Sequence, residues 1–315
     1  MTIHIPLPHR RRTSFAESFL LMGTVVTIRV VGEGGAHRMR DAIDRAIQAM
    51  RSVEETLTRF DEGSALRRLS RSAGVLTSVP PMLFHALKVA VEVASMTDGA
   101  FDPTVGRRLE ELGFNRHYLT GDTVDSDFLD SQSVSFRDIT LVDEDLQVRL
   151  EKPMGLDLGA IAKGLAVDLA ARELNGWEGF AIDAGGDIYV SGVDPHGGLW
   201  QVGIENPLDA RSLLGRIKVT NKAVCTSGSY KRQSPKHPQI HHLLNARTGE
   251  PAQGLISCTV VGPQAMMADV VATAAFLLGP DRALPFIEEM GLSGLCVTDE
   301  LEMRETTGLG AIGDE

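Results

Sequence analysis

The sequence is poor in cysteine and in aromatic residues, with three cysteines and 5% Phe, Trp and Tyr among 315 residues. Cys225, Cys258 and Cys296 are widely spaced and odd in number, which argues against a complete disulfide framework and offers no zinc or redox motif. We therefore expect ordinary buried thiols in a reducing compartment.

Long apolar runs and an excess of positive charge are also missing. No segment reaches the roughly 18 apolar residues of a membrane span. The net charge of −11 argues against a nucleic-acid surface, which needs clustered positive charge. Arg10-Arg11-Arg12 followed by Phe19-Leu20-Leu21 only faintly suggests an export signal, because the apolar run is short and continues into a strand-like alternation over 24–30. We expect a cytoplasmic protein without a membrane span.

Several familiar catalytic signatures are absent as well. The chain has no G-x-x-x-x-G-K-[ST] phosphate loop, no G-x-G-x-x-G after a strand and no G-x-S-x-G elbow. Residues 226–231 have a glycine, Gly228, three positions before Lys231, where an acylating S-x-x-K motif needs serine. The sequence therefore supports neither a P-loop enzyme nor a serine hydrolase.

Hydrophobic periodicity predicts an α+β fold, in which antiparallel or mixed sheets are flanked by helices in a single integrated unit. Apolar residues at steps of three and four predict helices over 36–59, 81–96, 160–175 and 265–278, with a shorter one through 286–287. Alternating or short apolar runs predict strands over 24–30, 139–142, 146–150, 180–183, 188–191, 200–204, 216–219, 256–261 and 295–298. We expect a flexible N-terminal segment over 1–17, one folded unit over 18–300 and a tail over 301–315.

The most informative segment is residues 155–164, Gly-Leu-Asp-Leu-Gly-Ala-Ile-Ala-Lys-Gly. It places Asp157, Lys163 and three glycines where an apolar helix begins. A helix start offers unpaired N–H groups and a positive dipole end, which suit anionic oxygens such as phosphate. A tight loop packed under the helix, with Asp157 and Lys163 as an ordinary ion pair, is the alternative interpretation.

Two further pairs of polar residues are candidates for a metal site or for a structural role. Asp269 and Thr273 are four apart on the predicted helix 265–278, so both oxygens share one face and suit a hard cation such as Mg²⁺. An aspartate near a helix start can equally serve as a cap. Asp183 and Asp187 flank Gly185-Gly186, where carboxylates commonly support turn geometry.

Three histidines cluster at His237, His241 and His242. Pro235 and Pro238 flank His237, which argues against a metal-binding helix and a zinc site. His242 is a candidate acid–base group, and a solvated or packed histidine is the alternative.

Taken in order, these segments resemble the ApbE-type FAD:protein FMN transferases over about residues 18–300. The resemblance rests on these motifs: Met22-Gly23-Thr24, Phe101 to Gly106, Asp157 to Gly164, Asp183-Ala184-Gly185-Gly186-Asp187, Thr226-Ser227-Gly228, His242 to Gly249 and Ala268 to Ala274. It implies Mg²⁺-dependent transfer of FMN from FAD to a Ser or Thr hydroxyl of an acceptor flavoprotein, with release of AMP.

The resemblance also implies roles for individual residues. The metal would be held by the Ala160 carbonyl, the Asp269 carboxylate and the Thr273 hydroxyl. Asp157 and Lys163 would contact FAD and take part in catalysis. The rest of the FAD site would be formed by Met22, Phe60, Ala100, Phe101, Asp102, Asp183 and Leu243. We assign the base that deprotonates the acceptor hydroxyl to His242.

Three positions depart from the family pattern. Asn245-Ala246 stands where Asp-Pro is usual, Ser229 where an acidic residue is common, and Phe60 where a polar or tyrosine side chain is frequent. These departures bear on rate and acceptor choice. Water as acceptor would give an FAD pyrophosphatase, and loss of chemistry would leave an FAD-binding protein. A purely structural or interaction protein is disfavoured, because such a protein would give no reason for several loops to be rich in Gly, Asp, Thr and His.

Overall fold

The computed structural model describes residues 12–124 and 133–309. Its α-helices are α1 (Gly35–Leu57), α2 (Ala65–Ser70), α3 (Pro81–Met96), α4 (Gly106–Glu111), α5 (Gly159–Glu173), α6 (Ala265–Leu278) and α7 (Ala283–Glu289), with 3₁₀ turns η1 (Pro103–Val105) and η2 (Phe136–Asp138). No helix among these residues is long and apolar enough to cross a membrane.

The strands form one large sheet and three small ones. The large sheet joins β1 (Ser14–Leu21), β2 (Thr24–Val31), β6 (Gly179–Ala184), β7 (Asp187–Gly192), β10 (Lys222–Gly228), β13 (Leu255–Gly262), β14 (Ser293–Thr298) and β15 (Met303–Glu305), in that spatial order. The small sheets are β3 (Thr77–Ser78) with β5 (Gln147–Leu150) and β4 (Ile139–Val142), β8 (Trp200–Asn206) with β9 (Asp209–Val219), and β11 (Leu244–Asn245) with β12 (Glu250–Pro251). Neighbours in the large sheet all pair antiparallel, which confirms the α+β prediction.

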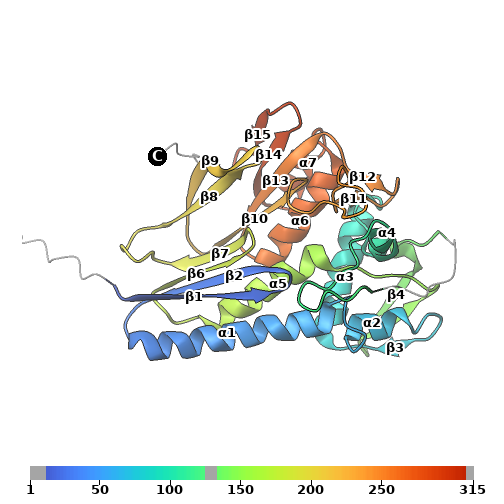
Figure 1. The fold of residues 1–315 in the computed structure, drawn as a ribbon, viewed down its shortest axis with the longest axis horizontal. Helices are drawn as coiled ribbons and strands as arrows, with labels where there is room; N and C mark the ends of the chain where they lie inside the picture. The colour runs from blue at the N-terminus through green and yellow to red at the C-terminus, as the bar shows by residue number, and fades with distance from the viewer. Residues whose placement is uncertain (1–11, 125–132, 310–315) are drawn as a thin grey trace, which may run out of the picture.

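The two faces of the large sheet are covered differently, as Figure 1 shows. Helices α1, α5 and α6 lie on one face, and the β8–β9 hairpin lies on the other. Trp200, Val202, Ile204 and Ile217 of the hairpin pack against apolar side chains of the sheet. The helical face holds the main core, and it is the face that positions the polar residues described below.

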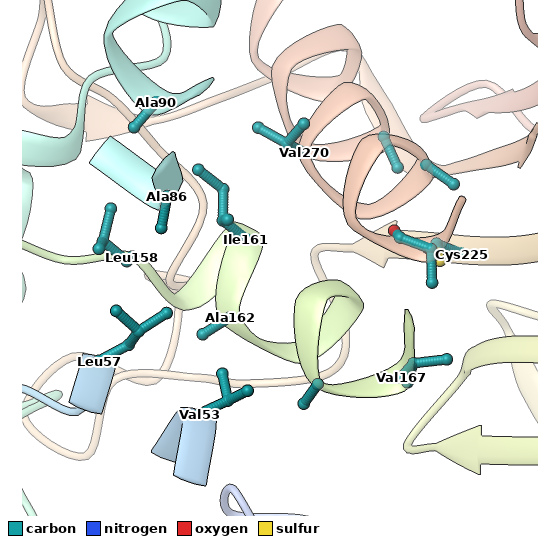
Figure 2. Close-up of a cluster of buried hydrophobic side chains, with 14 of the residues drawn as sticks. Val53, Leu57, Ala86, Ala90, Leu158, Ile161, Ala162, Val167, Cys225 and Val270 are labelled. Atoms are coloured by element: carbon teal, nitrogen blue, oxygen red, sulfur yellow. Dashed lines mark hydrogen bonds between the residues drawn. The ribbon is translucent and has the colours of Figure 1, made fainter. Parts of the chain in front are cut away.

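Helix α5 runs through the middle of the main core. Small residues at Ala162, Gly164, Ala166 and Ala170 are buried, so neighbouring helices approach its backbone closely. Figure 2 shows α5 side chains surrounded by residues of several elements: Val53 and Leu57 of α1, Ala86 and Ala90 of α3, Cys225 of β10 and Val270 of α6. The start of α5 is thereby fixed relative to α6 and to the sheet.

The ends of the fold differ from the predicted boundaries. Strand β1 begins at Ser14, inside the segment 1–17 that we predicted to be flexible, and it pairs with β2 along its whole length. The apolar run at residues 19–21 belongs to this strand, where Leu21 is buried and Leu20 faces outward. At the other end, Met303–Glu305 of the predicted tail pairs with β14 as β15. Residues 1–11 and 310–315 lie outside the described part of the chain.

Candidate active site

A lysine and two buried carboxylates meet where α5, β7 and α6 converge. Lys163, on the first turns of α5, forms an ion pair with Asp187 at the start of β7. Its Nζ lies 3.6 Å from Asp269 Oδ2 on α6. Asp187 and Asp269 are 1% and 3% exposed, so one ammonium group serves two carboxylates that are nearly excluded from water.

The cluster has one ammonium group for two carboxyl groups. Burial raises the pKa of Asp269, and the neighbouring Asp187 carboxylate raises it further. Burial opposes the charge of Lys163, but the two carboxylates outweigh that effect and raise its pKa above its usual range. With both carboxylates ionised the cluster carries a net negative charge, so a further cation beside it is electrostatically favourable.

The oxygens around Asp269 have the chemistry of a hard-cation site. Thr273 lies one turn along α6, and its hydroxyl is 2.9 Å from that of Ser227 on β10. The Gly164 N–H donates to Asp269 Oδ2 at 3.1 Å. In a regular α-helix that N–H donates to the Ala160 carbonyl. Because it also donates to Asp269, its hydrogen bond to the Ala160 oxygen is weaker, and this oxygen is more available to a ligand.

This donor set fits Mg²⁺, which prefers carboxylate, hydroxyl and carbonyl oxygens. Within residues 12–124 and 133–309, no group of three or more His, Cys, Asp or Glu side chains is placed to hold a metal ion. A metal here therefore depends on mixed donors of the kind that Ala160, Asp269 and Thr273 provide.

Asp168 fixes the distance between α5 and α6. Its carboxylate, on α5, accepts the N–H groups of Ala265 and Met266 at 2.7 and 2.9 Å, and so caps the first turn of α6. Gly164 then lies directly against that turn, where a Cβ would overlap the backbone of Ala265 and Met266. Close contact of the two backbones is thus a condition for Lys163 to reach Asp269.

We expect Gly164→Ala to destabilise the protein by about 1–3 kcal/mol, because the backbone of α6 cannot move aside as a flexible side chain would. The midpoint of urea unfolding measures this cost. Gly198→Ala is the control, since the nearest atoms to a Cβ there belong to the Asp194 carboxylate and lie at ordinary distances of 3.7 Å or more. Equal midpoints for the two variants would show that the α5–α6 contact is not tight.

Asp157 does not pair with Lys163, and the predicted alternative of an ion pair between them is wrong. Asp157 Oδ2 instead accepts from Arg59 Nε at 2.6 Å, and its Oδ1 accepts from the Gly159 N–H at 2.9 Å. Burial opposes the charge of Asp157, but Arg59 and this N–H hold its pKa below the usual range. Asp157 therefore supports the start of α5, while Arg59 also binds the Phe114 carbonyl and lies 3.7 Å from Glu110.

The two adjacent histidines, His241 and His242, differ in whether a ring nitrogen is left without a hydrogen-bond partner among the described residues. His241 is buried, and its ring nitrogens contact the Ala252 carbonyl and the Leu243 N–H, so it has no nitrogen left for a ligand. His242 Nδ1 lies 3.4 Å from the Arg232 carbonyl, which can only accept, so we assign the proton to Nδ1 and leave Nε2 as the available base. Burial, and then the nearby Arg232, lower the pKa of His242 to about 3.

The other predicted FAD residues occupy two neighbouring regions. Ala100, Phe101 and Asp102 are buried next to η1, where both Asp102 oxygens accept backbone N–H groups, from Thr104 and Phe136. The Ala100 carbonyl accepts from the Ala246 N–H at 3.0 Å, which ties this segment to the loop after His242 and Leu243.

Met22 and Phe60 lie at the β1–β2 turn and after α1. The Met22 N–H donates to Glu54 at 2.9 Å, and Glu54 also hydrogen-bonds to Tyr118. Phe60 carries the Arg59 guanidinium over its ring at 4.4 Å and meets His117 edge-on. These contacts connect the aromatic residues to the Arg59–Asp157 pair.

Of the two aspartates that we expected to support the turn between β6 and β7, one does so. Asp183 Oδ1 accepts from the Gly186 N–H at 3.0 Å, as predicted for a carboxylate that supports a turn. Asp187 has no such role and is instead the partner of Lys163. Gly185, at φ +68°, is packed so closely against the Thr24 side chain that a Cβ would overlap it.

Four residues of this site were not predicted: Arg59, Asp187 as a partner of Lys163, Ser227 as a partner of Thr273, and Arg232. Only Asp187 and Ser227 fall in motifs that the sequence singled out. Arg59 reaches Asp157 across 98 positions of the chain, and no local pattern signals such a contact.

A cavity of about 350 Å³ is lined by none of the three residues Lys163, Asp187 and Asp269. Its lining comes from the turn after α3, from η1, α4 and η2, and from β11 and the loop that follows it, and Asp102 is the one predicted site residue in this lining. Four arginines, Arg107, Arg108, Arg137 and Arg247, line it together with Asp98 and Glu111. Each of these arginines lies within 4.0 Å of one of those carboxylates, with Arg107 and Arg108 sharing Glu111 and Arg137 and Arg247 sharing Asp98.

The structure is an α+β fold in which Lys163, Asp187 and Asp269 form a buried charged cluster, with the Thr273 hydroxyl on the same helix as Asp269. The chain belongs to the ApbE family, whose profile matches residues 22–296. A Treponema pallidum protein named FAD:protein FMN transferase is 27% identical over 321 residues, which covers 95% of this chain and 88% of that protein. A Haemophilus influenzae protein of the same name is 28% identical, with 86% and 83% covered.

Solved structures show the same fold. The crystal structure of the ApbE protein of Thermotoga maritima has a TM-score of 0.81 and 27% identity, and covers 94% of this chain and 97% of that chain. The flavin transferase ApbE of Vibrio cholerae has a TM-score of 0.79 at 24% identity, with 96% and 100% covered, which is a likeness of fold. The family resemblance stated from the sequence is confirmed.

Proposed function

We propose that this protein transfers the FMN half of FAD to a Ser or Thr hydroxyl of an acceptor flavoprotein, in a Mg²⁺-dependent reaction that releases AMP. The observation that carries the proposal is the cluster of Lys163, Asp187 and Asp269, with the Thr273 hydroxyl on the same helix and a neutral His242 nearby. Family membership and the names of the relatives support it.

Mg²⁺ would be held by the Ala160 carbonyl, the Asp269 carboxylate and the Thr273 hydroxyl. When bound, it offsets the negative charge that grows on the phosphoryl oxygens. The Lys163 ammonium group, beside the proposed metal ligand Asp269, would add a second positive charge. Asp187 holds this ammonium group in place.

His242 would accept the proton of the acceptor hydroxyl at Nε2. The freed oxygen forms a bond to the phosphorus of the FMN half, and the bond from that phosphorus to the AMP oxygen breaks. AMP leaves, and the acceptor keeps FMN as a phosphoester. The lowered pKa keeps the His242 ring neutral near pH 7, so the lone pair of Nε2 is free to accept a hydrogen bond from the acceptor hydroxyl.

The test is one incubation of the purified protein with FAD, Mg²⁺ and a candidate acceptor flavoprotein, followed by intact mass of the acceptor and by AMP release. We expect AMP together with an FMN-sized mass gain, both lost in EDTA. The matched control is the same acceptor with its target Ser or Thr changed to alanine, which should gain no mass.

Other products would overturn the proposal in different ways. AMP with free FMN and no modified acceptor, across several acceptors, would identify an FAD pyrophosphatase. Bound FAD without AMP would identify a flavin-binding protein.

A further inference from the structure

The basic side chains around His242 differ in whether they have a carboxylate partner. Arg59 binds Asp157 and the Phe114 carbonyl, and Lys163 binds Asp187 and Asp269. Arg232 is different. Within residues 12–124 and 133–309, no carboxylate lies within ion-pair distance of its guanidinium, and its side chain is exposed.

Backbone pairing places Arg232 beside His242. Gln233 and His241 form an antiparallel bridge, so Arg232 stands directly opposite His242. The His242 N–H donates to the Arg232 carbonyl at 3.2 Å. Because directly opposed residues of an antiparallel pair project to the same side, the guanidinium and the imidazole lie on one face.

The surroundings of the guanidinium indicate a recess. Its Cζ lies 6.0 Å from the centre of the Phe114 ring, which covers one side. Desolvation lowers the pKa of Arg232 although the side chain remains exposed, and the nearest opposite charge, Asp157, is already bonded to Arg59. A charged, partly desolvated fork of N–H donors that has no carboxylate partner in the described part of the chain is suited to an anion with two oxygens.

We infer that Arg232 binds the pyrophosphate of the dinucleotide substrate, next to His242. This inference rests on the proposed function, which supplies the substrate. The isoalloxazine, ribityl, ribose and adenine groups of FAD are neutral, so the pyrophosphate is the only part that needs a guanidinium. Bidentate hydrogen bonds from Arg232 to phosphoryl oxygens would hold the phosphorus near Nε2 of His242.

The test measures binding rather than turnover, in EDTA so that FAD is not consumed. Titrations compare FAD, ADP and riboflavin, since the first two carry a pyrophosphate and the third carries no phosphate. We expect Arg232→Gln to weaken FAD and ADP binding about 10- to 100-fold and to leave riboflavin binding unchanged. Arg232→Lys keeps the charge but not the fork, and should give an intermediate loss.

Lys231→Gln is the matched control. Lys231 is the adjacent residue, is also exposed, and pairs with Glu205 on β8. Its loss should leave all three affinities unchanged. The urea midpoint of each variant checks that the fold is intact, and because the Arg232 side chain is exposed we expect no shift.

The outcomes separate the two ideas. A wild-type protein that binds neither FAD nor ADP, in EDTA or with Mg²⁺ added, contradicts the proposed function. A wild-type protein that binds both, with Arg232→Gln equal to it, contradicts only the role of Arg232. A variant that loses riboflavin binding to the same degree as FAD binding also contradicts that role, because the defect would then not involve phosphate.

Discussion

Lys163→Met is expected to destabilise the protein by about 3–5 kcal/mol, because it leaves Asp187 buried without its counter-ion. Asp269 can relieve part of the repulsion by taking up a proton, as its raised pKa indicates, but Asp187 cannot return to water. The measurement is the free energy of unfolding from urea titration.

The control for Lys163→Met is Lys88→Met. Lys88 also pairs with one aspartate, Asp143, at 2.5 Å, but its side chain is 40% exposed and that of Asp143 is 67% exposed. Its removal should change the free energy of unfolding little, because a surface ion pair is solvated and screened by salt. Equal costs for the two lysines would show that the Lys163 cluster is solvated like a surface pair.

A double variant tests the cause of that cost. Lys163→Met with Asp187→Asn removes the ammonium and its nearest carboxylate together. We expect it to be more stable than Lys163→Met alone, because Asp187 is then no longer a buried charge, and burial keeps the pKa of Asp269 raised so that this carboxyl can stay protonated. A double variant less stable than the single one would assign the loss to packing of the lysine side chain instead.

The same lysine should matter for catalysis. We expect Lys163→Met to lower kcat for AMP release by about 10²–10³, since one charge that offsets the phosphoryl oxygens is lost. A variant that folds and keeps the wild-type kcat would leave Lys163 a structural role alone.

Helices with a strong period were predictable from the sequence. The predicted bounds of α3 and α6 match the observed Pro81–Met96 and Ala265–Leu278, since their apolar positions repeat over many residues. Strand β10 was missed. Its residues, Lys222–Gly228, are mostly small or polar and are buried on both faces of the sheet, so no alternation marks them.

In the site, too, contacts within one regular helix were predictable and contacts between distant elements were not. The spacing of Asp269 and Thr273 predicted a shared face, because both lie on one regular helix. The partners of Asp157 and Lys163 were not predictable, because they come from elements 98 and 24 positions away. Tertiary packing decides which aspartate meets which cation, and sequence proximity favoured the wrong pair.

His242→Gln is expected to lower kcat for FMN transfer by about 10²–10⁴ with little change in KM for FAD. Glutamine keeps a polar side chain of similar size but cannot accept the proton of the acceptor hydroxyl. Steady-state AMP release measures the loss. His237→Gln is the control, because His237 is exposed and belongs to the same segment. Equal rates for the two variants would rule out His242 as the base.

The pH dependence provides a second measurement on His242. Its pKa in the folded protein is lowered to about 3, below the value near 6.5 of an unperturbed histidine. The unfolded chain therefore binds more protons between these values, so this residue stabilises the protein above pH 6.5 and the stabilisation is lost as pH falls toward 3. His242→Gln should flatten that part of the stability curve.

The neutral ring also predicts the shape of the pH–rate profile. At saturating Mg²⁺, kcat/KM for FAD reports groups of the free enzyme, so His242 should add no acidic limb near pH 6.5. Histidine NMR spectra can follow the ring directly, with its signal assigned by loss in His242→Gln. We expect that signal to stay constant from pH 8 to pH 5. A signal that titrates near 6.5 would show that Arg232 and the surrounding protein do not hold the ring neutral, and the base would then operate only above that pH.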